Sequence, residues 1–74
     1  MFAVDTRALR VAMAERGIYQ IRQLEEATGV NRNTLSGVLQ GTVRPSSIVI
    51  TKIVDSLGLS PEMVGRIFFT RKLT

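Results

Sequence analysis

The segment of residues 25–41, with the sequence EEATGVNRNTLSGVLQG, constrains the fold more than any other part of the chain. Gly29 stands where a left-handed residue would end one short helix. Asn31 is a residue type that caps the start of the next helix, and Gly41 is placed to end it. The segment therefore predicts two short helices joined by a tight turn, the arrangement of a helix-turn-helix.

Capping and turn residues predict further helices on both sides of this segment. Asp5 or Thr6 fits the N-cap of a first helix, and Ser46 or Ser47 fits the N-cap of a fourth. Ser60–Pro61 starts a fifth, because proline is tolerated at the first helical position. The predicted helices span about residues 6–16, 21–28, 32–40, 47–57 and 61–68.

Apolar residues recur at helical spacing in each of these segments, so each helix has one face to bury. The tail 69–74 alternates apolar and polar residues, which fits either a short strand or a frayed end. We therefore expect an all-α fold, a compact five-helix domain that spans residues 1–74 with the helix-turn-helix at about residues 20–40. The inward residues expected in the helix-turn-helix are Leu24, Val30, Leu35 and Val38.

Composition excludes several kinds of chemistry. The chain has no Cys and no His, which removes disulfides, thiolate metal sites, imidazole catalysis and the usual zinc ligands. Its six carboxylates form no recognisable catalytic site, and the adjacent pair Glu25–Glu26 points apart on a helix. We therefore expect no enzymatic activity, no cofactor and no metal. The absence of Cys favours a cytoplasmic protein, in the bacterial cytosol or nucleoid. No apolar run approaches the roughly 18–20 residues that span a bilayer, so we expect no membrane insertion.

The charge distribution favours an anionic partner. The formal charge is +4, yet residues 1–30 balance four Arg against four acids. No acidic residue occurs from Ala27 to Val54, so positive charge dominates from the second helix of the motif onward. The simpler interpretation is a soluble basic domain with no anionic partner, and a charge of this size does not exclude it.

The spacing of the turn glycine and the apolar residues resembles that of a known family. Over roughly residues 6–68 the chain is similar to the helix-turn-helix domains of the lambdoid-phage repressor and Cro type, also called the xenobiotic-response-element family. The resemblance implies that the domain binds double-stranded DNA and places the helix at 32–40 in the major groove. The residues that carry the resemblance are Leu24, Gly29, Val30, Leu35, Val38, Gly41, Pro45, Leu57, Gly58 and Ser60.

The helix at 32–40 offers candidates for reading bases. If Leu35 and Val38 face the core, the opposite face of this helix is available to DNA. Arg can grip guanine bidentately, and Asn or Gln can grip adenine. The simpler interpretation is a solvated polar face, which the preceding turn motif disfavours. The candidate base-reading residues are Arg32, Asn33, Ser36, Gly37 and Gln40.

Other residues around the motif are candidates for phosphate contacts, which position a domain without reading its sequence. Arg44 follows the helix in the loop where the family grips the sugar–phosphate backbone; an ordinary exposed charge is the alternative. Asn31 is expected to cap its helix whether or not it also contacts DNA. The candidate phosphate-binding residues are Gln20, Asn31, Thr34, Thr42 and Arg44.

The chain departs from the family pattern at two positions in the first helix of the motif. Ile21 stands where the family usually has a Gln that contacts phosphate, and the neighbouring Gln20 is the candidate substitute. Glu25 stands where the family usually has Ala. Its side chain must therefore point outward or be paired.

Apolar residues near the C-terminus suggest self-association, because a chain of 74 residues has little core left to cover them. The family usually binds two half-sites as a dimer, which favours the same interpretation. The alternative is that Phe2 and Val4 fold back against these residues and close the core of a monomer. The candidate dimer-interface residues are Ile67, Phe68, Phe69 and Leu73.

The predicted function is a sequence-specific transcriptional regulator that binds a double-stranded DNA operator as a homodimer. A Cro-like or repressor protein of a phage or mobile element fits such a minimal chain, and an antitoxin that represses its own operon is a variant. No small-molecule ligand is expected. The competing class is a protein-interaction adaptor or antirepressor that uses the helices without DNA, for which the helix at 32–40 would be a poor apolar anchor.

Overall fold

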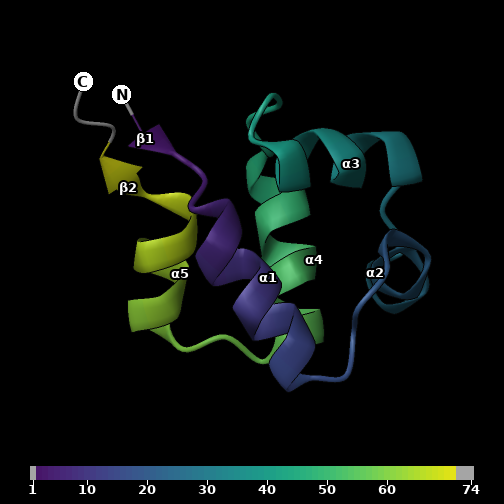
Figure 1. Ribbon diagram of the computed structural model, residues 1–74. Coiled ribbons are helices and arrows are strands. Elements are labelled where there is room, and N and C mark those ends of the chain that lie inside the picture. The colour runs from purple at the N-terminus through teal and green to yellow at the C-terminus, as the bar shows by residue number, and fades with distance from the viewer. Residues whose placement is uncertain (1, 72–74) are drawn as a thin grey trace.

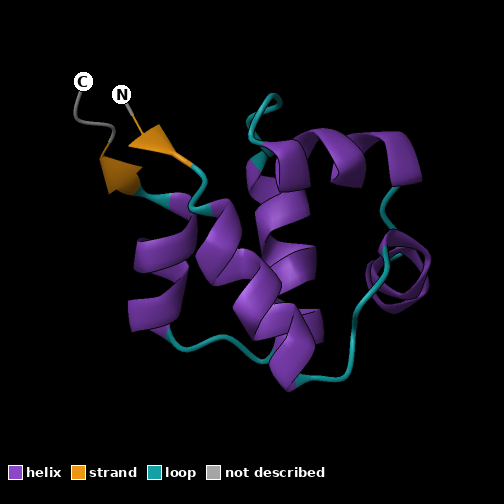
Figure 2. Cartoon of the chain, viewed as in Figure 1, coloured by secondary structure: helices purple, strands orange, loops and turns teal. Residues whose placement is uncertain are grey.

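Five helices and one pair of short strands make up the computed structural model, which describes residues 2–71 (Figures 1 and 2). The predicted all-α class is confirmed, and each predicted helix is present to within one residue of its expected ends. The helices are α1 (Thr6–Glu15), α2 (Ile21–Thr28), α3 (Arg32–Gln40), α4 (Ser47–Leu57) and α5 (Pro61–Phe68). The strands are β1 (Phe2–Ala3) and β2 (Thr70–Arg71). No helix among the described residues is long and apolar enough to cross a membrane.

Side-chain caps fix where three of these helices begin. Asp5, Ser46 and Ser60 are the N-caps of α1, α4 and α5, and each accepts the backbone N–H three residues on, at 3.0, 3.3 and 3.2 Å. Each bond satisfies one of the N–H groups that the first turn of a helix leaves free. The predicted N-cap alternatives Thr6 and Ser47 are instead the first helical residues of α1 and α4.

The core collects the apolar face of every helix. Its largest fully buried side chains each remove enough apolar surface from water to contribute about 1.5–3 kcal/mol. They come from all five helices, so no helix is held by its own backbone alone. These residues are Leu9, Leu24, Leu35, Val38, Ile53, Leu57 and Ile67.

The two ends of the chain meet in a small antiparallel sheet, where Phe2 pairs with Arg71 and Ala3 with Thr70 (Figure 2). Next to this sheet the backbone N–H of Asp5 donates to the carbonyl of Ile67 at 2.7 Å. The tail predicted as strand or frayed end is thus a strand as far as Arg71, and its partner is the N-terminus.

The proposed dimer contact at Ile67 and Phe68 is wrong, because both side chains belong to the core of one chain. Ile67 is fully buried and Phe68 is 4% exposed, and Val4 packs against the same core. Of the two residues named in the alternative interpretation, Val4 packs against this core, as that interpretation proposed. Phe69 is 45% exposed, and Leu73 lies outside the described residues.

Helices α2 and α3 cross steeply and place α3 at the edge of the molecule. In Figure 1, α2 is seen nearly along its axis while α3 runs across the view. Helix α3 packs against α2 and α1, and α2 also packs against α4. The paired chain ends lie away from α3 (Figure 1). One long side of α3 is therefore supported by the core, and the other faces outward.

Candidate nucleic-acid interface

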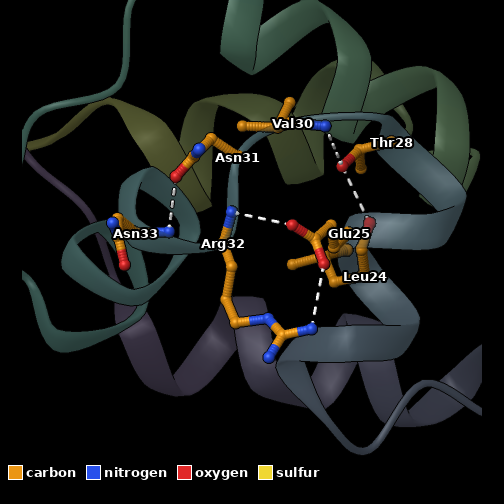
Figure 3. A network of polar contacts seen from close by, with 7 residues as sticks. All are labelled: Leu24, Glu25, Thr28, Val30, Asn31, Arg32 and Asn33. Carbon is orange, nitrogen blue, oxygen red and sulfur yellow. Dashed lines mark hydrogen bonds and ion pairs between the residues drawn. The ribbon is translucent and has the colours of Figure 1, made fainter.

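The turn between α2 and α3 is held by hydrogen bonds of its own residues (Figure 3). The Thr28 hydroxyl donates to the Leu24 carbonyl at 2.7 Å and accepts the backbone N–H of Val30 at 3.1 Å. Between them Gly29 has φ +73°, a left-handed conformation in which a Cβ is strained. Val30 is buried. The turn that the glycine predicted therefore fixes the direction in which the chain enters α3.

Two acceptors satisfy the first free N–H groups of α3. Asn31 is the N-cap, and its Oδ1 accepts the backbone N–H of Asn33 at 2.7 Å (Figure 3). Glu25 comes from α2, and its Oε2 accepts the backbone N–H of Arg32 at 3.1 Å. The predicted capping role of Asn31 is confirmed, and a second cap comes from the neighbouring helix.

Glu25 is the acidic residue that departs from the family pattern, and its carboxylate is paired. Its Oε1 accepts from Nη2 of Arg32 at 3.1 Å, the one ion pair found among residues 2–71 (Figure 3). The side chains are 58% exposed for Arg32 and 35% for Glu25. At such exposure solvent screens the pair, which contributes about 0.2–1 kcal/mol to stability. The pair matters more for where it holds Arg32 than for how much it stabilises the fold.

The outward face of α3 is polar and carries no acid of its own. Arg32, Asn33 and Gln40 are exposed, and Ser36 is half-buried between them. Nε2 of Gln40 donates to Oγ of Ser36 at 3.4 Å. The opposite face is buried through Leu35, Val38 and Leu39. Four of the five candidate base-reading residues thus share one accessible face.

Gly37 is the exception, and its predicted place on the exposed face is wrong. It is buried because the loop after α3 turns back over it. A Cβ at this position would lie 2.8 Å from Cβ of Val43 and closer still to its Cγ2. The Gly37 carbonyl accepts the backbone N–H groups of Thr42 and Val43 at 2.9 and 3.1 Å. Glycine at this position allows the close approach of that loop.

The candidate phosphate-binding residues lie around the ends of α2 and α3. Gln20 is the exposed N-cap of α2, and Thr34 is half-buried in the first turns of α3. The Thr42 hydroxyl donates to the Gly37 carbonyl at 3.3 Å, so part of its role is to close the end of α3. Arg44 is exposed in the loop beyond α3, beside the buried Pro45. Thr34, Thr42 and Arg44 lie on α3 or in the loop that follows it, whereas Gln20 lies at the start of α2.

One contact to α3 was not predicted from the sequence. Nη2 of Arg10, on α1, donates to the carbonyl of Leu39 at 3.3 Å. A cation at this place satisfies a free carbonyl and interacts favourably with the negative end of the helix dipole. The sequence separation of 29 residues explains why no local pattern reveals it. Among the described residues, no group of three or more acidic side chains is placed to hold a metal ion.

A steeply crossed pair of short helices, a rigid glycine turn between them and an acid-free outer face on the second helix together define a helix-turn-helix DNA-binding domain. The chain belongs to the Cro/C1-type HTH DNA-binding domain family, whose model matches residues 8–62. That range begins in α1 and ends in the first turn of α5, so it contains both helices of the motif. No curated protein and no solved structure matches the chain significantly.

Proposed function

We propose that this protein is a sequence-specific regulator of transcription that reads the major groove of double-stranded DNA with α3. The observation that carries the proposal is the outer face of α3, where Arg32, Asn33 and Gln40 are exposed together on a helix held from behind by the core. Arg can bind the O6 and N7 of guanine, and Asn or Gln can bind the N6 and N7 of adenine. Ser36 supports this face through its contact with Gln40.

The dependence of duplex binding on salt tests this proposal against the protein-interaction alternative. Contacts to phosphates release condensed counterions, so log affinity should fall linearly with log salt, with a slope of about −0.9 for each neutralised phosphate. Fluorescence anisotropy of a labelled duplex at several salt concentrations measures the slope. Binding of duplex that does not respond to salt, or no binding of duplex at low salt, would contradict the proposal and favour an adaptor or antirepressor.

Arg44 is expected to bind phosphate. Every duplex presents phosphates, so Arg44→Ala should weaken binding to preferred and unrelated duplexes by similar factors and reduce the salt slope by about one unit. Lys52→Ala is the matched control, because it removes the same charge from an exposed position on α4. Equal effects of the two variants would mean that Arg44 acts only through net charge. A loss confined to the preferred duplex would mean that Arg44 reads a base or groove shape.

The finer role that we propose is that of a Cro-like or repressor protein of a phage or mobile element. The support is membership of a family described as Cro/C1-type, together with the exposed candidate base-reading side chains of α3. A reporter gene placed behind a preferred site checks the sign of the regulation. Reduced expression is the expected result, and increased expression would contradict a repressor.

We also propose that the protein binds DNA as a homodimer. Two copies of α3 could then enter successive major grooves on one side of a near-palindromic duplex, about 34 Å apart. The buried Ile67 and Phe68 are not available as the contact, so the support is the family resemblance alone. Sedimentation at micromolar concentration, with and without duplex, measures the oligomeric state. A monomer under both conditions would contradict the proposal.

A further inference from the structure

The Glu25–Arg32 ion pair joins the two helices of the motif beside the outer face of α3 (Figure 3). The carboxylate bonds Arg32 twice, with Oε2 at the backbone N–H and Oε1 at Nη2, each at 3.1 Å. One acceptor group therefore fixes both where this side chain leaves the helix and where its guanidinium lies. Arg32 is held against α2 although 58% of its side chain is exposed.

The held guanidinium still has donors to offer. Arginine carries five N–H donors in a rigid fork, and in the described part of the chain the contact with Glu25 uses Nη2. The remaining donors can meet a guanine edge in one fixed place. An arginine that is already ordered loses less conformational entropy on binding than one that moves freely. A freely moving arginine, in contrast, can reach the phosphates of any duplex.

We propose that Glu25 is a positioning residue that sets sequence discrimination by acting through Arg32. The inference rests on the proposed function and adds the residue that limits binding to unrelated DNA. Glu25 keeps Arg32 in one orientation, and its negative charge offsets the positive charge beside the duplex. A duplex that offers Arg32 only a phosphate gains little from it, whereas a guanine at the fixed place meets a donor pair that is already aligned.

Glu25→Gln tests the proposal, because the amide oxygen still accepts a hydrogen bond while the charge is lost. Affinity for an unrelated duplex should rise about 1.4- to 5-fold, which corresponds to the free-energy range measured for exposed ion pairs. The salt slope on that duplex should steepen by up to about one unit, because one more cation is free to meet a phosphate. Affinity for the preferred duplex should stay level or fall, so the ratio of the two affinities should decrease.

Glu26→Gln is the matched control. Glu26 is the next residue of α2, is exposed, and lies outside the ion pair with Arg32. Removing its charge should strengthen binding to both duplexes equally and leave the ratio unchanged. A second comparison is made in the Arg32→Gln background, where the positioned side chain is absent. There, adding Glu25→Gln should change the ratio no more than Glu26→Gln does.

Thermal unfolding of each variant checks that α3 keeps its place, and the affinity ratio decides the question. A ratio for Glu25→Gln below the ratios of both wild type and Glu26→Gln supports the proposal. A ratio for Glu25→Gln that equals or exceeds the ratio of wild type or of Glu26→Gln overturns it. The proposal is also overturned if Glu25→Gln lowers the ratio as much in the Arg32→Gln background as in the wild-type background. If the wild-type protein binds all duplexes with equal affinity, the proposed function itself is overturned. This measurement on wild type is made before any variant is compared.

Discussion

Gly37→Ala is expected to lower the free energy of unfolding by about 1–2 kcal/mol, although alanine favours helix more than glycine does. The added Cβ would lie 2.8 Å from Cβ of Val43, a distance that neighbouring side chains do not tolerate. Val43 cannot turn aside easily, because its backbone N–H is bonded to the Gly37 carbonyl at 3.1 Å. Overpacking of this kind costs about 1–3 kcal/mol, and the better helix propensity of alanine offsets up to about 1 kcal/mol.

Urea unfolding of three further variants separates the contact from helix propensity. Gly65→Ala is the matched control, because Gly65 lies inside α5 and a Cβ there meets nothing within 4 Å. It should raise stability by about 0.5–1 kcal/mol. Gly37→Ala should cost much less stability in a Val43→Gly background than in the wild-type background, because the side chain that the new Cβ would meet is then absent. A Gly37→Ala protein that is as stable as Gly65→Ala would show that the loop does not press on α3.

Asn33→Ala is expected to reduce affinity for the preferred duplex by about 1–3 kcal/mol and affinity for unrelated DNA by much less. The Asn33 side chain is exposed on α3, one residue beyond the paired Arg32 and two beyond the cap Asn31. Only its backbone N–H takes part in the cap, so the fold should not depend on its side chain. Competition of labelled preferred duplex with both kinds of DNA measures the two affinities.

Asn31→Ala is the control for a variant that weakens the start of α3 without removing a base-reading side chain. It removes the acceptor for the backbone N–H of Asn33, so it should lower stability by about 0.5–2 kcal/mol. Its effect on binding should be similar for preferred and unrelated duplexes. An Asn33→Ala variant that loses affinity equally on both duplexes would resemble this control, and Asn33 would then not read sequence.

Local chemistry explains why so much of the fold could be predicted. A cap such as Asn31 or Asp5 satisfies N–H groups two or three residues away, so the local sequence is enough to predict it. The turn at Gly29 likewise needs a left-handed residue at that one position. Helix ends, the motif and the polar face of α3 all follow from such short-range requirements.

The wrong predictions concern contacts between residues that are far apart in the chain. Ile67 and Phe68 looked uncovered because nothing near them in sequence covers them. In the structure they lie in one core with residues of all five helices, and Val4 packs against that core. Gly37 was placed outward from the helical period alone, which contains no information about where the Val43 loop returns. The Arg10–Leu39 contact has the same long-range character. Glu25 gave a partial signal, since an acid in this place needs a partner, but only the crossing of α2 and α3 identifies Arg32.

Selection of binding sites from a pool of random duplexes tests the central claim, that α3 reads DNA sequence. The wild-type protein should enrich a short sequence with adenine or guanine at the positions that face α3, as Asn, Gln and Arg side chains require. The Asn33→Ala protein should recover sites in which at least one of these positions is no longer constrained. The claim would be contradicted if the wild-type protein bound duplex but enriched no sequence. It would also be contradicted if the Asn33→Ala protein selected the same sites as wild type.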